Sequence, residues 1–194
     1  MSAKINFFLI VKDHFRTLGD VSGKKSKLDL FTFYGVPLIF GFFYGLKGSG
    51  VKPDVLSMLV NFGSIFTALL LSVLMLVYEQ QNKLEERNDA RACVGGISFF
   101  KEKKCLLEQL YSNISYSVIV SMLLVMFSFL YVLVDSVLFE LDFHLFGVDG
   151  LELNVGNWIC IYLIAPVLIF ITVNLILTIL MVVKRTYSLL IMKI

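Results

Sequence analysis

Four stretches of this chain carry no charged side chain over a length close to the thickness of a bilayer's hydrocarbon core. That core is about 30 Å thick, so a helix that crosses it needs roughly 20 apolar residues. The stretches are Leu30–Leu46, Val55–Val77, Ile114–Val134 and Trp158–Val183. Backbone polar groups in hydrocarbon must pair within their own segment, and these runs lack the alternation of barrel strands. We therefore expect an all-α, polytopic membrane protein with four transmembrane helices.

The composition excludes several other classes of protein. Hydrophobic residues make up 58% of the 194 residues and charged residues 16%, whereas soluble domains have about 45–50% and about 25%. Too little polar surface remains for a soluble enzyme, a disordered tail or a disulfide-stapled secreted domain. The formal net charge of +2 gives no reason to expect direct binding of nucleic acid.

The basic residues that flank the runs set the expected orientation. Residues 1–29, 78–113 and 184–194 together hold fifteen Lys and Arg side chains, the first inter-helix loop holds two, and residues 135–157 hold none. Because basic residues are retained on the cytoplasmic side, both termini and the central segment should be cytoplasmic. The expected organisation is a cytoplasmic N-terminal segment 1–29, a transmembrane hairpin 30–77, a cytoplasmic helical hairpin 78–113, a second transmembrane hairpin 114–183 with an outer loop 135–157, and a cytoplasmic tail 184–194.

Residues 5–18 predict an amphipathic helix near the N-terminus. If this helix lay on the inner membrane surface, its apolar side chains would face the lipid. These side chains are Ile5, Phe8, Leu9, Phe15 and Leu18. Packing of the same helix against the transmembrane bundle is an equally good interpretation.

Polar side chains form a stripe on each of two predicted transmembrane helices. At 100° per residue, each stripe falls within an arc of about 80°. The stripes are Ser57, Asn61, Ser64, Ser72 and Glu79 on the second helix, and Asn113, Ser117, Ser121, Ser128 and Asp135 on the third. Since polar groups avoid lipid, the two helices should face each other or a subunit axis. The stripes could line a water-filled path, or they could hold the helices together by hydrogen bonds.

The first predicted span contains the small-residue pattern Gly41-Phe-Phe-Tyr-Gly45. Two glycines four residues apart allow another helix backbone to approach closely. Packing within the chain and self-association of two copies are both consistent with this pattern.

The central segment is the largest part expected outside the membrane. Residues 78–92 and 97–110 read as two polar helices separated by Gly95 and Gly96. This hairpin is either a solvated connector or a docking surface for a soluble partner. The candidate docking residues are Arg87, Arg91, Lys101, Lys103 and Lys104.

The side chains that support catalysis or metal binding are few and scattered. His14 and His144 are expected on opposite sides of the membrane, so they cannot form a pair. Cys93, Cys105 and Cys160 lack metal-ligand spacing, and we expect no disulfide between them. The acids of residues 140–156 could bind a divalent cation, but the retention of basic residues on the other side of the membrane is the favoured explanation of these acids. We expect no catalytic residue, no cofactor and no metal site.

Two passages resemble the membrane subunit of the Kiwa antiphage defence system. They are Phe31-Thr-Phe-Tyr-Gly-Val-Pro-Leu38, which opens the first span, and Glu108-Gln-Leu-Tyr-Ser-Asn-Ile-Ser-Tyr116, which opens the third. The layout of the whole chain is similar to that subunit. The resemblance implies a homo-oligomeric protein of the bacterial inner membrane that senses phage attack and holds a soluble, DNA-binding effector beneath the bilayer.

Three functions are consistent with these features. The first is a non-enzymatic membrane sensor and scaffold that uses residues 78–110 to dock a cytoplasmic effector. The second is an oligomeric channel or pore-forming effector that uses the two polar stripes. The third is an assembly or immunity factor for another membrane protein, which composition does not separate from the first.

Overall fold

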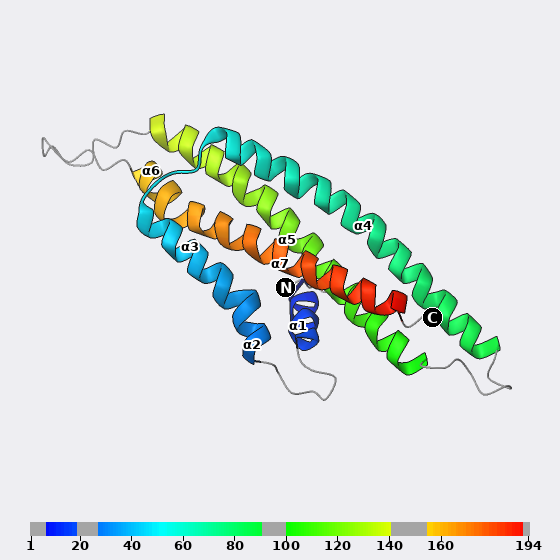
Figure 1. The fold of residues 1–194 in the computed structure, drawn as a ribbon. Coiled ribbons are helices and arrows are strands. Elements are labelled where there is room, and N and C mark those ends of the chain that lie inside the picture. The colour runs from blue at the N-terminus through cyan, green and yellow to red at the C-terminus, as the bar shows by residue number, and fades with distance from the viewer. Residues whose placement is uncertain (1–6, 19–26, 91–99, 141–154, 192–194) are drawn as a thin grey trace, which may run out of the picture.

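The structure, a computed structural model, describes residues 7–18, 27–90, 100–140 and 155–191 (Figure 1). All regular structure in these ranges is helical. The helices are α1 (Phe7–Thr17), α2 (Lys27–Leu30), η1 (Phe31–Gly35), α3 (Val36–Lys47), α4 (Pro53–Ala90), α5 (Phe100–Glu140), α6 (Val155–Ile159), η3 (Cys160–Ile164) and α7 (Ala165–Ile191), where η marks a π-helical segment. Because α2, η1 and α3 follow one another without a break, as do α6, η3 and α7, each set forms one continuous rod.

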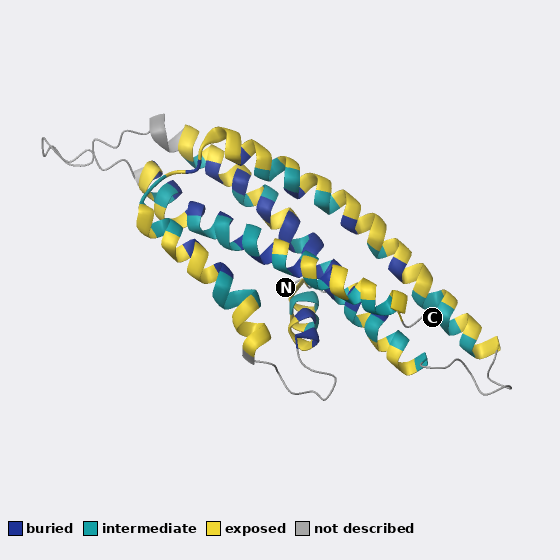
Figure 2. Cartoon of the chain, in the orientation of Figure 1, coloured by how far each residue is buried: buried dark blue, intermediate teal, exposed yellow. Residues whose placement is uncertain are grey.

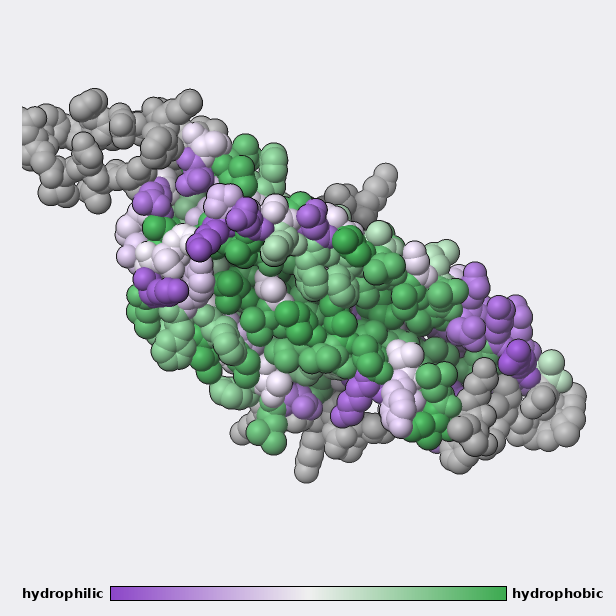
Figure 3. Space-filling view, turned by 45° about the horizontal axis from the view of Figure 1, so that its top comes forward, coloured by the Kyte–Doolittle hydropathy of each residue, from purple (hydrophilic) through white to green (hydrophobic). Residues whose placement is uncertain are grey.

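Four of these rods are long and apolar enough to cross a membrane. They comprise Leu28–Lys47, Pro53–Ala90, Phe100–Ser136 and Gly156–Ile191. The prediction of an all-α chain with four candidate transmembrane helices is therefore confirmed. Figure 3 shows hydrophobic side chains across the middle of one face and hydrophilic ones gathered toward its two ends. The side of the membrane on which each end lies stays a prediction.

The four long rods lie in an open row and do not close into a bundle. Among the described residues, α4 contacts only α5, α5 contacts α7, and α7 contacts α3. Figure 1 shows the same order, with α4 and α3 at opposite edges of the row. In Figure 2, dark blue is concentrated on α5 and α7, whereas α4 is mainly yellow and teal. The core of the protein is therefore built around α5 and α7.

One seam of small and branched side chains attaches α4 to α5. The buried residues of α4 are Leu56, Gly63, Leu70 and Val77, which recur every seven residues. A seven-residue repeat keeps one narrow face against a neighbouring helix. At Gly63 an added Cβ would lie 2.8 Å from a Val125 methyl group and 3.2 Å from the Ser121 carbonyl oxygen. Glycine at this position therefore allows α4 and α5 to pack closely.

The contact between α3 and α7 is centred on two glycines and a proline. Gly41 and Gly45 both face Pro166 of α7, and an added Cβ on Gly41 would lie 2.8 Å from the Pro166 carbonyl oxygen. The small-residue pattern of the first span thus lies at a contact within the chain. Gly48 ends α3 in the left-handed conformation, with φ of 63°, which glycine adopts without strain.

The two rods with a proline inside the helix each have a π-helical segment just before that proline, whereas Pro53 is the first residue of α4. η1 precedes Pro37 and η3 precedes Pro166. A proline has no N–H to donate to the carbonyl four residues earlier, and its ring crowds that carbonyl. The wider π turn makes room for the ring. For Pro37 the carbonyl in question belongs to Phe33, which is therefore left available to another donor.

The polar ends of α4 and α5 extend beyond the apolar parts of both helices. The Lys104 ammonium lies 2.8 Å from the Glu85 carboxylate, which brings the two ends together. Leu84 packs with the buried residues Leu107 and Leu110 in one cluster. The helices expected over residues 78–92 and 97–110 are thus present over Tyr78–Ala90 and Phe100–Leu110, and they are continuous with the second and third spans.

Candidate functional site

The described region richest in buried polar contacts lies where α1 meets α5. α1 turns His14 and Thr17 into the protein, while Phe8 and Leu9 are 56% and 58% exposed. This is the reverse of a helix on a water-soluble protein. Of the two interpretations of residues 5–18, packing against the bundle is the one that the structure shows. Leu18 is buried there, and Ile5 lies outside the described residues.

His14 and Thr17 meet one side chain of α5. The His14 Nδ1 atom lies 2.9 Å from Asn113 Oδ1, and the Thr17 hydroxyl donates to the same oxygen at 2.7 Å. The His14 ring stacks on the Tyr116 ring, with centroids 3.8 Å apart and planes within 2°. His14 and Asn113 are both completely buried. We call His14, Thr17, Asn113, Tyr116 and Asn174 the polar network.

The second half of the polar network joins α5 to α7 and η1. The Tyr116 hydroxyl donates to Asn174 Oδ1 at 2.9 Å, and the Asn174 amide donates to the Phe33 carbonyl oxygen at 2.8 Å. This carbonyl is the one that Pro37 leaves without its helical donor. The polar network therefore connects α1, η1, α5 and α7 through hydrogen bonds and one ring stack.

Arg185 of α7 holds the C-terminal end of α1. Its guanidinium donates to the Thr17 carbonyl oxygen at 2.7 Å and to the Gln109 carbonyl oxygen at 3.3 Å. The last carbonyls of a helix have no partner within the helix, and they carry partial negative charge. A half-buried cation that donates to one of them stabilises both the helix end and its docking.

His14 is neutral in this position. Burial lowers the pKa of His14 to about 4. The hydrogen bond to Asn113 Oδ1 opposes this shift by raising the pKa, and the nearby Arg185 charge lowers it further. Among the described residues, three buried side-chain polar atoms have no hydrogen-bond partner: His14 Nε2, Asn113 Nδ2 and Ser112 Oγ. Leaving such atoms unpaired destabilises the docked position of α1, because these atoms would be hydrogen-bonded to water if α1 were undocked. The site is thus suited to a conformational change at α1.

Four of the five members of the polar stripe on the third predicted span lie inside the protein, and Asp135 at its end is exposed. Ser117, Ser121 and Ser128 are completely buried on α5, as is Asn113. The Ser121 hydroxyl lies 2.8 Å from the Thr67 hydroxyl of α4, and the other two serines donate to carbonyls one turn earlier. This stripe therefore serves packing within the chain.

The polar stripe of the second predicted span faces away from α5. Asn61 and Ser64 are exposed, as are Ser57 and Ser72, and they lie roughly opposite the seam through Gly63 that contacts α5. The second and third predicted helices do lie side by side, as one of the two expected alternatives has it, but α4 uses its Gly63 face for this contact and not its polar stripe. The physical reason is steric, because the close approach of α4 and α5 requires the glycine and apolar face of α4.

The candidate docking residues lie on the polar ends of α4 and α5. Arg87 and Lys101 are exposed and Lys103 is half-buried. Lys104 is paired with Glu85, and Arg91 lies outside the described residues. The acids Glu79, Glu86 and Asp89 lie on the same end of α4, so the surface carries both signs of charge.

No metal or disulfide chemistry is evident among the described residues. They hold no group of three His, Cys, Asp or Glu side chains that could bind an ion. The thiols of Cys105 and Cys160 are both free, the first exposed and the second buried. Cys93, His144 and nearly all of the acidic segment 140–156 lie outside the residues whose side chains are described.

Sequence reasoning missed the central members of the polar network. Asn174 lies in the longest apolar run of the chain, and an amide in such a run is itself a sign of a buried partner. The sequence offers His14 only as a possible catalytic side chain, and its contact with Asn113 joins residues 99 positions apart. A pattern within one helix cannot reveal that pairing.

Comparison with known proteins gives no family for this chain. Neither the protein-family models, nor the curated proteins, nor the solved structures contain a match.

Proposed function

We propose that this chain is a non-enzymatic sensor and scaffold of the bacterial inner membrane, with both termini cytoplasmic. In this proposal it belongs to an antiphage defence complex, assembles with copies of itself, and docks a soluble effector on the polar ends of α4 and α5. The observation that carries the proposal is the continuity of α5. One unbroken helix, Phe100–Glu140, carries Asn113 of the polar network and the basic residues Lys101 and Lys103.

A single long helix supports signal transfer because it moves as one body. Asn113 is three helical turns from Lys101 (about 18 Å at 1.5 Å per residue). A shift of α1 that alters the His14–Asn113 contact would therefore displace the docking surface as well. The opposite charges on the ends of α4 and α5 favour a partner with a complementary mixed surface.

The docking role is tested with two exposed basic residues. Arg87→Glu combined with Lys101→Glu should strongly reduce co-purification of the soluble protein encoded beside this chain. Lys104 is unsuitable, because Lys104→Glu would also repel Glu85 within the hairpin. The matched control is Lys52→Glu, an exposed charge reversal in the loop between α3 and α4. Equal recovery with the double variant and the control would overturn the docking surface.

The exposed stripe of α4 supports assembly with a second copy. An asparagine facing hydrocarbon is unfavourable, and its amide is both donor and acceptor, so two copies of Asn61 could pair. Asn61→Cys should give a covalent dimer on oxidation in membranes. Met75 lies nearly four turns further along the same exposed side, so Met75→Cys tests whether the contact between copies extends along α4.

The same stripe favours a second candidate function, an oligomeric channel. In a ring of copies, the exposed stripe of α4 would line a polar path, whereas the buried stripe of α5 would not. Conductance in planar bilayers should then change with Asn61→Leu and stay the same with Ser128→Ala. Absence of conductance from the purified protein under all conditions would exclude this candidate.

A further inference from the structure

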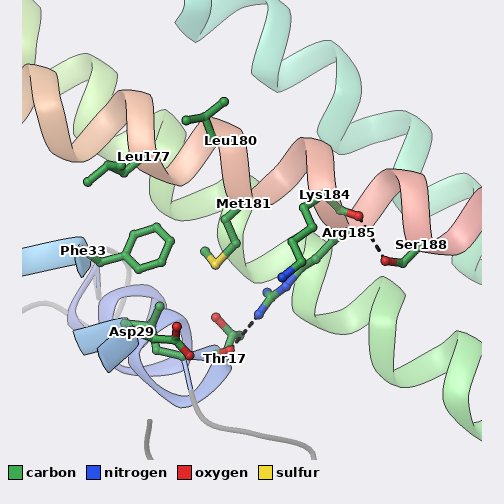
Figure 4. Close-up of a pocket in the computed structure, with 10 residues that line it drawn as sticks. Thr17, Asp29, Phe33, Leu177, Leu180, Met181, Lys184, Arg185 and Ser188 are labelled. Carbon is green, nitrogen blue, oxygen red and sulfur yellow. Dashed lines mark hydrogen bonds between the residues drawn. The ribbon is translucent and has the colours of Figure 1, made fainter. Parts of the chain in front are cut away.

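A cavity of about 570 Å³ lies between the end of α1, η1 and the last turns of α7. Figure 4 shows the side chains of Lys184 and Arg185 projecting from α7 toward Thr17, with Asp29 beside Thr17. Leu177, Leu180 and Met181 of α7 and Phe33 of η1 supply apolar walls. The cavity thus joins a charged part to an apolar part.

The position of the cavity along α7 matches the boundary between hydrocarbon and headgroups. The apolar run of this span ends at Val183, and Lys184 is the first charged residue after it. Leu177 and Leu180 lie one to two turns deeper. The apolar wall is therefore at the depth of acyl chains, and the two cations are at the depth of lipid phosphates.

The charged part of the cavity is suited to a phosphate group. Lys184 and Arg185 bring two positive charges and Asp29 one negative charge, so the wall keeps an excess of one positive charge. Arg185 donates one hydrogen bond to Thr17 of α1 and one to Gln109 of α5. A guanidinium has five N–H groups, so others remain for an anion. The Lys184 ammonium adds three more donors.

We propose that this cavity binds a phospholipid of the adjacent leaflet, with an anionic headgroup preferred. The phosphate lies against Lys184 and Arg185, and one acyl chain lies against Phe33, Leu180 and Met181. Basic sites between transmembrane helices on the cytoplasmic side hold such headgroups in this way. The proposal does not depend on the effector docking described above.

A bound lipid would contact both partners of the α1 docking contact. Thr17 and Leu18 of α1 line the same cavity as Arg185. The lipid would therefore add to the attachment of α1, and its loss would weaken that attachment without any change in the polar network.

The test measures retention of phosphatidylglycerol by the purified full-length protein, with phosphatidylcholine as the reference lipid and inorganic phosphate as a competitor. Native mass spectrometry counts the bound lipids. Lys184→Gln leaves the Arg185 contact with α1 in place, and Met181→Trp fills the apolar part while keeping both charges. Lys101→Gln removes an exposed charge remote from the cavity and serves as the matched control.

We expect phosphatidylglycerol to be preferred by the unchanged protein and retention to fall about fivefold with Lys184→Gln. Met181→Trp should also lower retention, and Lys101→Gln should not. Equal retention of the two lipids, or an equal loss with Lys101→Gln, would overturn the proposal. Displacement of phosphatidylglycerol by inorganic phosphate, with no effect of Met181→Trp, would mean a free-phosphate site and would overturn the lipid assignment. Circular dichroism checks that each variant keeps its helices.

Discussion

The two polar stripes on α4 and α5 have similar spacing in the sequence and opposite surroundings in the fold. On α5, Asn113, Ser117 and Ser121 are covered by α1, α4 and α7, and each has a hydrogen-bond partner within the chain. On α4, Asn61 and Ser64 are exposed. The presence of a polar stripe on a membrane helix therefore does not predict which surface, if any within the same chain, packs against it. Contacts within one chain account for the buried α5 stripe, whereas the α4 stripe is exposed, and our proposal is that a second copy covers it.

The largest effect on stability is expected beside the α5 stripe, where His14 contacts Asn113 and protonation of His14 would oppose the docking of α1. The pKa of docked His14 is lowered from 6.5 to about 4, so between these values the undocked helix binds a proton and the docked helix does not. Docking of α1 is then fully stable above about pH 6.5 and loses up to about 3 kcal/mol as the pH falls toward 4. Hydrogen exchange of the α1 amides at several pH values measures this loss.

The control for the pH effect is His14→Phe, which keeps a ring against Tyr116 and removes the titrating group. The protection of its α1 amides, after correction for the pH dependence of the intrinsic exchange rate, should stay constant over the same range. The same pH dependence in both proteins would show that another group controls docking.

The next effect is expected from removing the acceptor that His14 and Thr17 share. Asn113→Leu leaves the buried Nδ1 of His14 without a partner and removes one of the two acceptors of the Thr17 hydroxyl, which keeps the His14 carbonyl oxygen. The loss should destabilise the protein by about 2 kcal/mol. Thermal unfolding in detergent measures the change. The matched substitution on the other stripe, Asn61→Leu, should leave the unfolding temperature of the single chain almost unchanged. Equal shifts for the two leucine variants would contradict the difference between the stripes.

A smaller effect on stability is expected where the α5 stripe contacts α4. Ser121→Ala removes the hydrogen bond to Thr67, and such bonds between membrane helices contribute about 0.6 kcal/mol. Ser64→Ala, on the exposed side of α4, should change the stability of the single chain by much less. Denaturation in mixed micelles compares the two, and a larger loss for Ser64→Ala would mean that α4 packs through its other face.

The smallest effect on the single chain, and the sharpest test of the exposed stripe, is Asn61→Leu in membranes. The fold should be unchanged within about 0.5 kcal/mol, because the side chain has no partner on α5. Self-association should nevertheless fall, as measured by energy transfer between labelled copies in vesicles. Undiminished association would place the contact between copies elsewhere.

The four spans could be predicted because the thickness of hydrocarbon fixes the length of an apolar helix. Their pairing could not be predicted in the same way. The periodicity of α4 identifies two candidate faces, one polar and one with Gly63 and Leu70, and only the shape of α5 decides between them. For the polar network, the sequence reveals Asn113 as a polar residue but gives no sign that His14 lies against it.

The glycines of α3 are an intermediate case. The spacing of Gly41 and Gly45 predicts that some backbone approaches closely, and Pro166 of α7 is the group that does so. The partner is 125 residues away in sequence and lies in the last span. Local chemistry therefore predicts that a contact exists, while the fold decides what makes it.

The open row of helices has a consequence for biosynthesis. α3 and α4 leave the ribosome one after the other and are joined by only residues 48–52, yet they do not touch each other in the part of the chain that the structure describes. When α3 and α4 have been synthesised, the helices that they contact, α7 and α5, do not yet exist. α5 and α7 must therefore insert between α3 and α4 later. The connection of residues 48–52 keeps α3 and α4 close to each other before α5 and α7 are made. Once α5 is in place, the Val51 amide of this connection donates to the Tyr131 hydroxyl at 3.0 Å.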